Sequence, residues 1–235
     1  IQGLYSPGST FKMIVAIAAL KKNIINSNSS FFCEGKLEFG DRTYHCWKKN
    51  GHGKMNVTSA ISQSCDVFFY ELAKKVGIDA IAKVAGDFGL GEKFQISIEH
   101  QNKGIVPTKK WKKTNLGESW YGGETLITGI GQGYILSNPL QLAVMTARIA
   151  SGSKRILPSL IKDKKNKKFA EMSEYKNQIN TIKEAMFKVV NEYKGTAFKS
   201  KLENFQFSGK TGTSQVTKIS ISERESEDFR KKEID

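Results

Sequence analysis

The feature that most constrains this chain is the segment from Phe11 to Leu20, which is apolar on every face of a helix except at Lys12. The turn-forming run Tyr5–Gly8 comes directly before it. A helix without a polar face belongs inside a core, so other elements must surround it. We therefore expect the rest of the chain to be organised around this helix.

Ser9 and Lys12 lie at the start of the predicted helix. Ser9 falls in its first turn, where free backbone N–H groups and the helix dipole favour developing negative charge. Residues three apart on a helix are neighbours, and burial strips hydration from an amine, which favours its neutral form. The pair is therefore typical of a serine nucleophile with an adjacent base.

The Ser-x-x-Lys pattern alone does not identify a nucleophile, because it occurs four times in the chain. The other occurrences start at Ser151, Ser159 and Ser173, and their lysines lie in or beside charge-rich, loop-like sequence. Lys12, in contrast, is the only charge between Ser9 and Leu20. A buried lysine can also be merely paired, so this stretch alone leaves catalytic and structural roles open.

Length and charge narrow the class of protein. The 235 residues suffice for one sizeable core and are few for two domains. A formal charge of +14 suits nucleic acid, anionic lipid or acidic polymer, but no recognition helix or RNA-binding signature is present, and we expect no nucleic-acid partner. The opening in an apparent loop and the charged end, residues 223–235, predict a fragment from which targeting segments have been removed.

Hydrophobic spacing and turn residues predict a mainly helical chain. Helices are expected over residues 56–61, 67–76, 78–88, 139–150 and 181–194, the last with a capping box at Thr181 and Glu184. Loop-like structure is expected over 21–56 and 103–124, and a tight glycine-rich bend over 129–133. One or two short strands are expected within 154–168, and a further strand over 205–216.

The segment Gly209-Lys210-Thr211 could end a phosphate-binding loop, but that motif needs a glycine at position 204, which is Asn204. What remains is Ser-x-x-Lys from Ser9, Ser-x-Asp from Ser64, and Lys-Thr-Gly from Lys210, in that order. Acyl transfer explains all three motifs, since it needs a nucleophile, a proton relay, and contacts for a carboxylate and an oxyanion.

On these motifs the chain resembles the penicillin-binding transpeptidase family, and most closely its penicillin-binding protein 2 subfamily, the D,D-transpeptidases of cell elongation and rod shape. The resemblance runs from Ile1 to about Val216. It is carried by the stretches Tyr5–Lys12, Trp47–Gly53, Gly129–Gly133 and Ser208–Thr213. Asp66 stands where most of the wider family has Asn, which is similar to this subfamily's own variant.

The resemblance implies roles for individual residues. Ser9 would attack the penultimate D-alanine carbonyl of a stem peptide, and Lys12 would accept its proton. Ser64 would pass a proton to the leaving D-alanine, with Lys210 supporting this relay and Asp66 orienting Ser64 and Lys210, or else only capping a helix. Thr211 and Thr213 would bind the terminal carboxylate, Gly212 would keep the strand edge open, and the N–H groups of Ser9 and Thr213 would form an oxyanion hole.

The resemblance also implies an α+β fold of the penicillin-binding and serine β-lactamase type. Strands that flank the Lys-Thr-Gly strand and a last helix are absent, so we expect an incomplete fold: a partial transpeptidase domain at 1–217, a charged excursion or tail at 218–235, and doubtful activity for this chain alone. The implied location is the periplasmic face of the bacterial inner membrane. The implied partners are the D-Ala-D-Ala stem peptide, β-lactams and a membrane glycosyltransferase.

Two other kinds of protein remain open. A β-lactamase or β-lactam sensor would share the fold and the nucleophile, although the Gly-Ile-Gly-Gln-Gly stretch followed by Ser-Asn-Pro-Leu-Gln argues for a transpeptidase. A non-catalytic, basic scaffold could bind cell-wall polymer, but the intact Ser9, Lys12, Ser64 and Lys210 argue against it.

All three cysteines fall between positions 33 and 65, which suggests either one disulfide with a thiol left over or a metal site. Cys33, Cys46, Cys65 and His52 would complete a closed tetrahedral zinc shell, with His45 as the competing histidine. The resemblance adds that some relatives hold zinc in this region. We expect a structural Zn²⁺ that pins the loop to the Ser64 motif, and no cofactor for catalysis.

Overall fold

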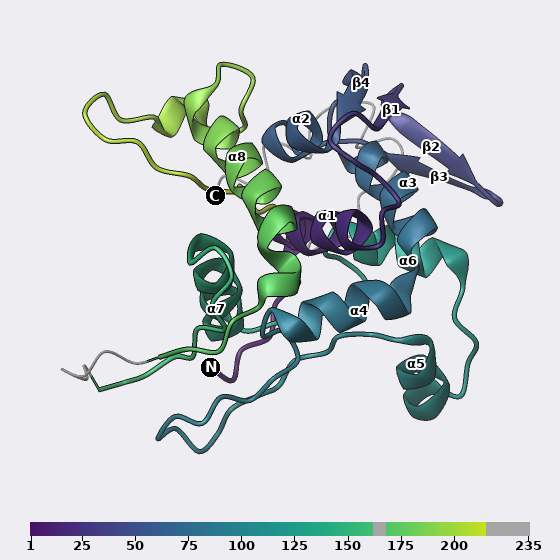
Figure 1. The fold of residues 1–235 in the computed structure, drawn as a ribbon. Helices are drawn as coiled ribbons and strands as arrows, with labels where there is room; N and C mark the ends of the chain where they lie inside the picture. Colours follow the sequence, from purple (N-terminus) through teal and green to yellow (C-terminus); the bar gives the residue numbers. More distant parts are fainter. Residues whose placement is uncertain (162–167, 215–235) are drawn as a thin grey trace, which may run out of the picture.

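The computed structural model of the protein describes residues 1–161 and 168–214, drawn in colour in Figure 1. The predicted tail at 218–235 lies outside these residues. In chain order the elements are η1 (Gly8–Phe11), α1 (Lys12–Lys21), β1 (Ser30–Cys33), β2 (Lys36–Phe39), β3 (Arg42–His45), β4 (Gly53–Asn56), α2 (Val57–Ser62), α3 (Asp66–Val76), α4 (Ile78–Asp87), α5 (Lys109–Leu116), α6 (Gly122–Gly129), α7 (Pro139–Ala150), η2 (Ser173–Tyr175), α8 (Lys176–Asn191) and η3 (Phe198–Ser200).

Helix α1 lies in the middle of the molecule, with α3, α4 and α8 packed against it (Figure 1). From Lys12 to Ala19 no residue exposes more than 2% of its surface. This burial follows from the absence of a polar face, and it confirms the prediction of a central helix. Ser9 lies in the short η1 turn just before α1, and Lys12 is the first residue of α1.

The predicted break between two helices is also confirmed. Asn56 caps α2 by accepting the N–H of Ser59, and α2 ends at Ser62. Helix α3 begins at Asp66, so Ser64 and Cys65 form the junction. The cap of α7 has the predicted form, since the Asn138 side chain accepts the N–H of Gln141 and Pro139 occupies the first turn.

The prediction of irregular structure over 21–56 is wrong. β1 pairs antiparallel with β4, and β2 pairs antiparallel with β3. Each strand has only four residues, which is too short for period-two alternation to be recognised. These ladders fold the cysteine-containing segment back on itself, and β4 leads directly into α2.

Two further predictions are wrong. The segment 103–124 contains α5, which Thr108 caps by accepting the N–H of Trp111, and the start of α6. Its periodicity was hidden because α5 is charge-rich and mostly exposed, apart from the buried Lys112 that pairs with Glu124. Helix α8 starts at Lys176, so the predicted cap at Thr181 lies inside the helix.

The segment expected as a strand over 205–216 contains no strand in its described part, up to Ser214. It is held instead by α8: the N–H of Gly209 donates to the Met186 carbonyl at 3.2 Å, and the Asn191 amide donates to the Phe207 carbonyl at 2.9 Å. A strand needs a neighbouring strand, and both ladders of the described residues lie elsewhere. The expected strands within 154–168 are reduced, in its described part, to one bridge between Lys154 and Glu171.

Across residues 1–161 and 168–214, none of the helices has the length and apolar character that crossing a bilayer requires.

Candidate active site

The turn that carries Ser9 is enclosed by two other segments. The N–H of Gly8 donates to the Gly131 carbonyl at 2.9 Å, which docks the turn on the glycine-rich bend. Gly8 has a φ of +56°, and a Cβ there would lie 2.3 Å from the carbonyl oxygen of Thr213. The close approach therefore requires glycine, and it places the turn that carries Ser9 directly against the Lys-Thr-Gly segment.

The amine of Lys12 is buried and points at the second motif. Its Nζ lies 2.7 Å from Asp66 Oδ1, 2.9 Å from the Ser64 carbonyl oxygen and 3.2 Å from Ser64 Oγ. These contacts use all three N–H donors of an ammonium. The hydroxyl of Ser9, by contrast, makes no hydrogen bond within the described residues. Lys12 therefore joins the first motif to the second through Ser64 and Asp66.

The third motif reaches the same hydroxyl. Lys210 Nζ donates to Ser64 Oγ at 2.9 Å, so Ser64 lies between two amines. Burial, followed by the nearby charge of Lys12, lowers the pKa of Lys210 to about 7. Near neutral pH Lys210 can therefore be neutral and can take up a proton through the Ser64 hydroxyl.

The contacts of the Asp66 carboxylate differ from those expected. Its carboxylate was expected to orient Ser64 and Lys210, but Oδ1 pairs with Lys12 and Oδ2 accepts the backbone N–H of Trp47 at 2.8 Å. The partner of Asp66 is therefore the buried lysine of the first motif. Lys12 and Asp66 are 54 positions apart, so the pairing has no local signal in the sequence.

Ser64 adopts a left-handed backbone conformation, with a φ of +54°. Non-glycine residues rarely occupy this region, and they do so mostly where the surrounding structure holds them. Here the Ser64 carbonyl accepts a hydrogen bond from the Lys12 amine at 2.9 Å and one from the indole N–H of Trp47 at 3.1 Å. The strained junction thus presents both oxygens of Ser64 to the site.

Trp47 was not among the predicted site residues. Its indole N–H is shared by the carbonyls of Gln63 and Ser64, each at 3.1 Å, and its ring packs edge-on against His52. About half of the side chain remains exposed beside the catalytic junction. The only sequence signal was its place at the head of the Trp47–Gly53 stretch.

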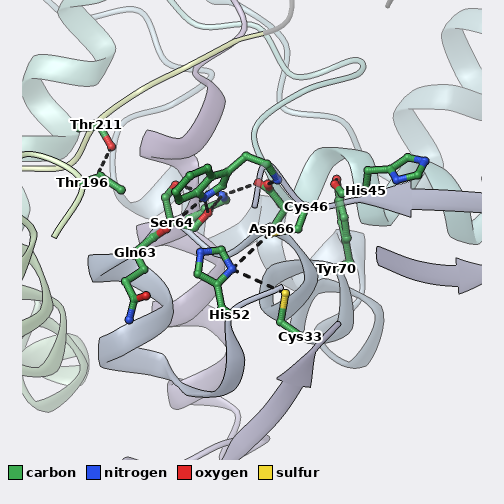
Figure 2. A network of polar contacts seen from close by, with 12 residues as sticks. Cys33, His45, Cys46, His52, Gln63, Ser64, Asp66, Tyr70, Thr196 and Thr211 are labelled. Atoms are coloured by element: carbon green, nitrogen blue, oxygen red, sulfur yellow. Dashed lines mark hydrogen bonds and ion pairs between the residues drawn. The ribbon is translucent and has the colours of Figure 1, made fainter. Parts of the chain in front are cut away.

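The residues predicted to bind substrate border the nucleophile turn. A Cβ at Gly212 would lie 3.1 Å from Thr10 Cγ2, which places this backbone against η1. Gly212 and Thr213 are exposed, and Thr211 is half-buried. The Thr211 hydroxyl lies 2.7 Å from the hydroxyl of Thr196, a residue that sequence reasoning also missed (Figure 2).

The predicted metal ligands come together. The ligand atoms of Cys33, Cys46, His52 and Cys65 all lie within 4.8 Å of one another. His52 Nδ1 is 3.7 Å from the Cys33 sulfur and 3.5 Å from the Cys46 sulfur (Figure 2). All three thiols are free, so no disulfide joins them. The competing His45 lies in β3 outside this cluster, and its carbonyl accepts the Tyr70 hydroxyl.

The thiols of this cluster change one another's pKa because they lie close together. A hydrogen bond from Cys65 lowers the pKa of the Cys46 thiol to about 3, while the same contact and then burial raise the pKa of Cys65. Burial also raises the pKa of Cys33. Three sulfurs and one imidazole form the soft donor set that suits a closed, tetrahedral zinc site.

Comparison with known proteins gives one consistent result. The family described as "Penicillin binding protein transpeptidase domain" matches residues 1–227. The peptidoglycan D,D-transpeptidase MrdA of Haemophilus influenzae is 34% identical over 99% of this chain, which spans 38% of that relative. The chain therefore covers less than two-fifths of the length of this curated relative.

Solved structures of related proteins are similar to this chain in both fold and sequence. The crystal structure of Pseudomonas aeruginosa PBP2 in complex with WCK 5153 matches with a TM-score of 0.84 and 35% identity, over 92% of this chain and 51% of that one. The complex between PBP2 and MreC from Helicobacter pylori matches with a TM-score of 0.84 and 35% identity, over 91% of this chain and 41% of that one.

Proposed function

The chain belongs to the penicillin-binding protein transpeptidase domain family, and we propose that it supplies the catalytic site of a peptidoglycan D,D-transpeptidase that cross-links stem peptides during cell elongation and rod-shape maintenance. One observation carries this proposal. Lys12 and Lys210, from the first and third motifs, both contact the hydroxyl of Ser64 from the second. Such convergence is what acyl transfer requires and what a binding scaffold does not.

In the acylation step, Ser9 Oγ attacks the carbonyl carbon of the penultimate D-alanine. The hydroxyl proton passes to the pair of amines, Lys12 and Lys210, which the Ser64 hydroxyl connects. As the peptide bond breaks, Ser64 delivers a proton to the leaving D-alanine nitrogen and is reprotonated by the same pair. The net result is an ester on Ser9 and one free D-alanine.

Substrate binding uses the segment that borders the nucleophile turn. The hydroxyls of Thr211 and Thr213 would hold the terminal carboxylate. The backbone N–H groups of Ser9 and Thr213 would stabilise the oxyanion, a contribution of about 3 kcal/mol per donor in related sites. The contact of Gly8 with the Thr213 carbonyl supports this arrangement, because it brings these two backbones together.

In the second step, an amine of a neighbouring stem peptide attacks the ester and forms the cross-link. A β-lactamase would use water instead. Because the chain resembles transpeptidases in sequence, we propose that β-lactams acylate Ser9 and that the resulting acyl-enzyme is hydrolysed slowly.

We also propose that Cys33, Cys46, His52 and Cys65 hold a structural Zn²⁺. The gathering of the four donors within 4.8 Å supports the site, and His52 Nε2, buried without a partner among the described residues, leaves Nδ1 as the engaged nitrogen. Zinc would be held tetrahedrally and would take no part in the chemistry. Because Cys65 lies between Ser64 and Asp66, and Cys46 precedes Trp47, these bonds would fix the catalytic junction from two sides.

We place the protein on the periplasmic face of the bacterial inner membrane, with a membrane glycosyltransferase of the elongation machinery as partner. The Helicobacter pylori relative has been solved as a complex with MreC, which supports assembly with other proteins and does not itself identify a glycosyltransferase.

The test of this function is the fate of a chromogenic β-lactam given to the full-length protein. A transpeptidase is expected to release a stoichiometric burst and then turn over slowly, with the burst absent in Ser9→Ala. Rapid, repeated hydrolysis would make the protein a β-lactamase. Absence of any burst in the wild-type protein would remove the acyl-enzyme mechanism.

A further inference from the structure

The segment just after α8 crosses from that helix to the catalytic junction. The N–H of Thr196 donates to the Ser62 carbonyl at 3.1 Å, and the N–H of Ala197 donates to the Val189 carbonyl at 3.0 Å. A Cβ at Gly195 would lie 2.2 Å from the Val189 carbonyl oxygen, so the backbone there is pressed against the end of α8. Thr196 is therefore held by its backbone on both sides.

The side chain of Thr196 is exposed, and its hydroxyl lies 2.7 Å from the hydroxyl of Thr211, as Figure 2 shows. A hydrogen bond between an exposed and a half-buried hydroxyl contributes little to folding, since water competes for the partners. Thr211 belongs to the segment that the proposed function assigns to the terminal carboxylate. The contact thus links a residue outside the three motifs to the segment proposed to bind the carboxylate.

Either hydroxyl can donate in this contact, and the hydrogen-bonding capacity of Thr211 is compatible with Thr196 as the donor. A threonine hydroxyl has one proton and two acceptor lone pairs. Lys210 Nζ lies 3.4 Å from Thr211 Oγ1 and occupies one acceptor position. If Thr196 donates to the other, both acceptor positions of Thr211 are occupied. The single proton of Thr211 is then free to point to the ligand.

We propose that Thr196 is a substrate-positioning residue, whose hydroxyl donates to Thr211 Oγ1 and thereby directs the Thr211 proton to the terminal carboxylate of the stem peptide or of a β-lactam. This inference rests on the proposed function of the Ser9 site and adds a residue to it. Donors in series polarise one another, so the chain from Thr196 through Thr211 binds an anion better than Thr211 alone.

The test compares two ligands that differ only in this carboxylate: benzylpenicillin and its methyl ester. Acylation of the full-length protein is followed by mass spectrometry for the wild type, Thr196→Val, Thr196→Ser and Thr114→Val. Valine keeps the shape of threonine without the hydroxyl, and serine restores the hydroxyl. Thr114 is an exposed threonine of α5 and serves as the matched control.

We expect Thr196→Val to lower the second-order rate of acylation by benzylpenicillin about fivefold, the effect of one lost hydrogen bond of ordinary strength. Thr196→Ser should recover the rate, Thr114→Val should leave it unchanged, and the slower reaction of the methyl ester should be the same in all four proteins. An unchanged rate in Thr196→Val would overturn the proposal. So would an equal loss with acid and ester, which would mean that Thr196 only supports the local backbone. If the wild-type protein is not acylated at all, the proposed function fails instead.

Discussion

The two amines that flank Ser64 predict a pH dependence of acylation that Lys210 controls. Lys12 is paired with Asp66 at 2.7 Å, and burial and the charge of Lys12 lower the pKa of Lys210 to about 7. Below that pH Lys210 carries a proton and cannot take up the proton of Ser9. Above it Lys210 is neutral, and Ser64 can pass the Ser9 proton to it.

The size of the effect follows from this pKa. About one-tenth of the molecules hold a neutral Lys210 at about pH 6 and about nine-tenths at about pH 8, so the acylation rate should rise about tenfold over this interval. Lys210→Arg removes the titration, because a guanidinium stays charged over the whole range. Its rate should therefore not rise with pH, and near pH 8 it should lie more than about tenfold below that of the wild type, because the variant has no neutral amine at any pH in this range.

The assay is the initial rate of labelling by a fluorescent penicillin in the full-length protein. Lys199→Arg, which changes an exposed lysine of η3, is the matched control and should keep the wild-type profile. The reasoning is refuted if the wild-type rate is flat or falls across this range. It is equally refuted if Lys210→Arg retains the rise.

Three more outcomes are expected. Asp66→Asn leaves the buried Lys12 charge without its counterion and should lower the free energy of unfolding by about 3 kcal/mol, measured by urea titration. Asp41→Asn, at an exposed residue, should not lower it. Equal urea midpoints for the two variants would contradict the pairing of Lys12 with Asp66. Gly8→Ala should abolish most acylation, because its Cβ would meet the Thr213 carbonyl, while Gly40→Ala, at φ +62° in open space, should keep it; similar activity in both would argue against the contact. Elemental analysis should find stoichiometric zinc in the wild type and in His45→Ala and none in His52→Ala or Cys65→Ser; zinc-free wild-type protein would refute the site.

The features that the sequence predicted correctly are those with local causes. The burial of α1 follows from its apolar faces, and the junction at Ser64 lies between a helix capped by Asn56 and one that begins at Asp66. The clustering of the cysteines with His52 was also visible, because all three cysteines fall between positions 33 and 65 of the sequence. In these places composition and turn chemistry act within a few residues.

The features that it missed depend on partners distant in the chain. The contacts of Lys12 with Asp66, and of Thr196 with Thr211, join separate elements and leave no periodic trace. The strand expected around Lys210 had the right alternation, but alternation cannot create the neighbouring strand that a ladder requires. The short ladders from β1 to β4 fall below the length at which a pattern can be distinguished from irregular sequence.

The central claim is that Ser9 is the nucleophile of an acyl-transfer site built from three motifs. The most direct measurement is peptide mapping by mass spectrometry of the full-length protein after brief exposure to penicillin. We predict a mass increase of one penicillin on the peptide that contains Ser9, severely reduced in Lys12→Ala and absent in Ser9→Ala. An adduct on any other residue, or labelling that survives Ser9→Ala, would contradict the claim.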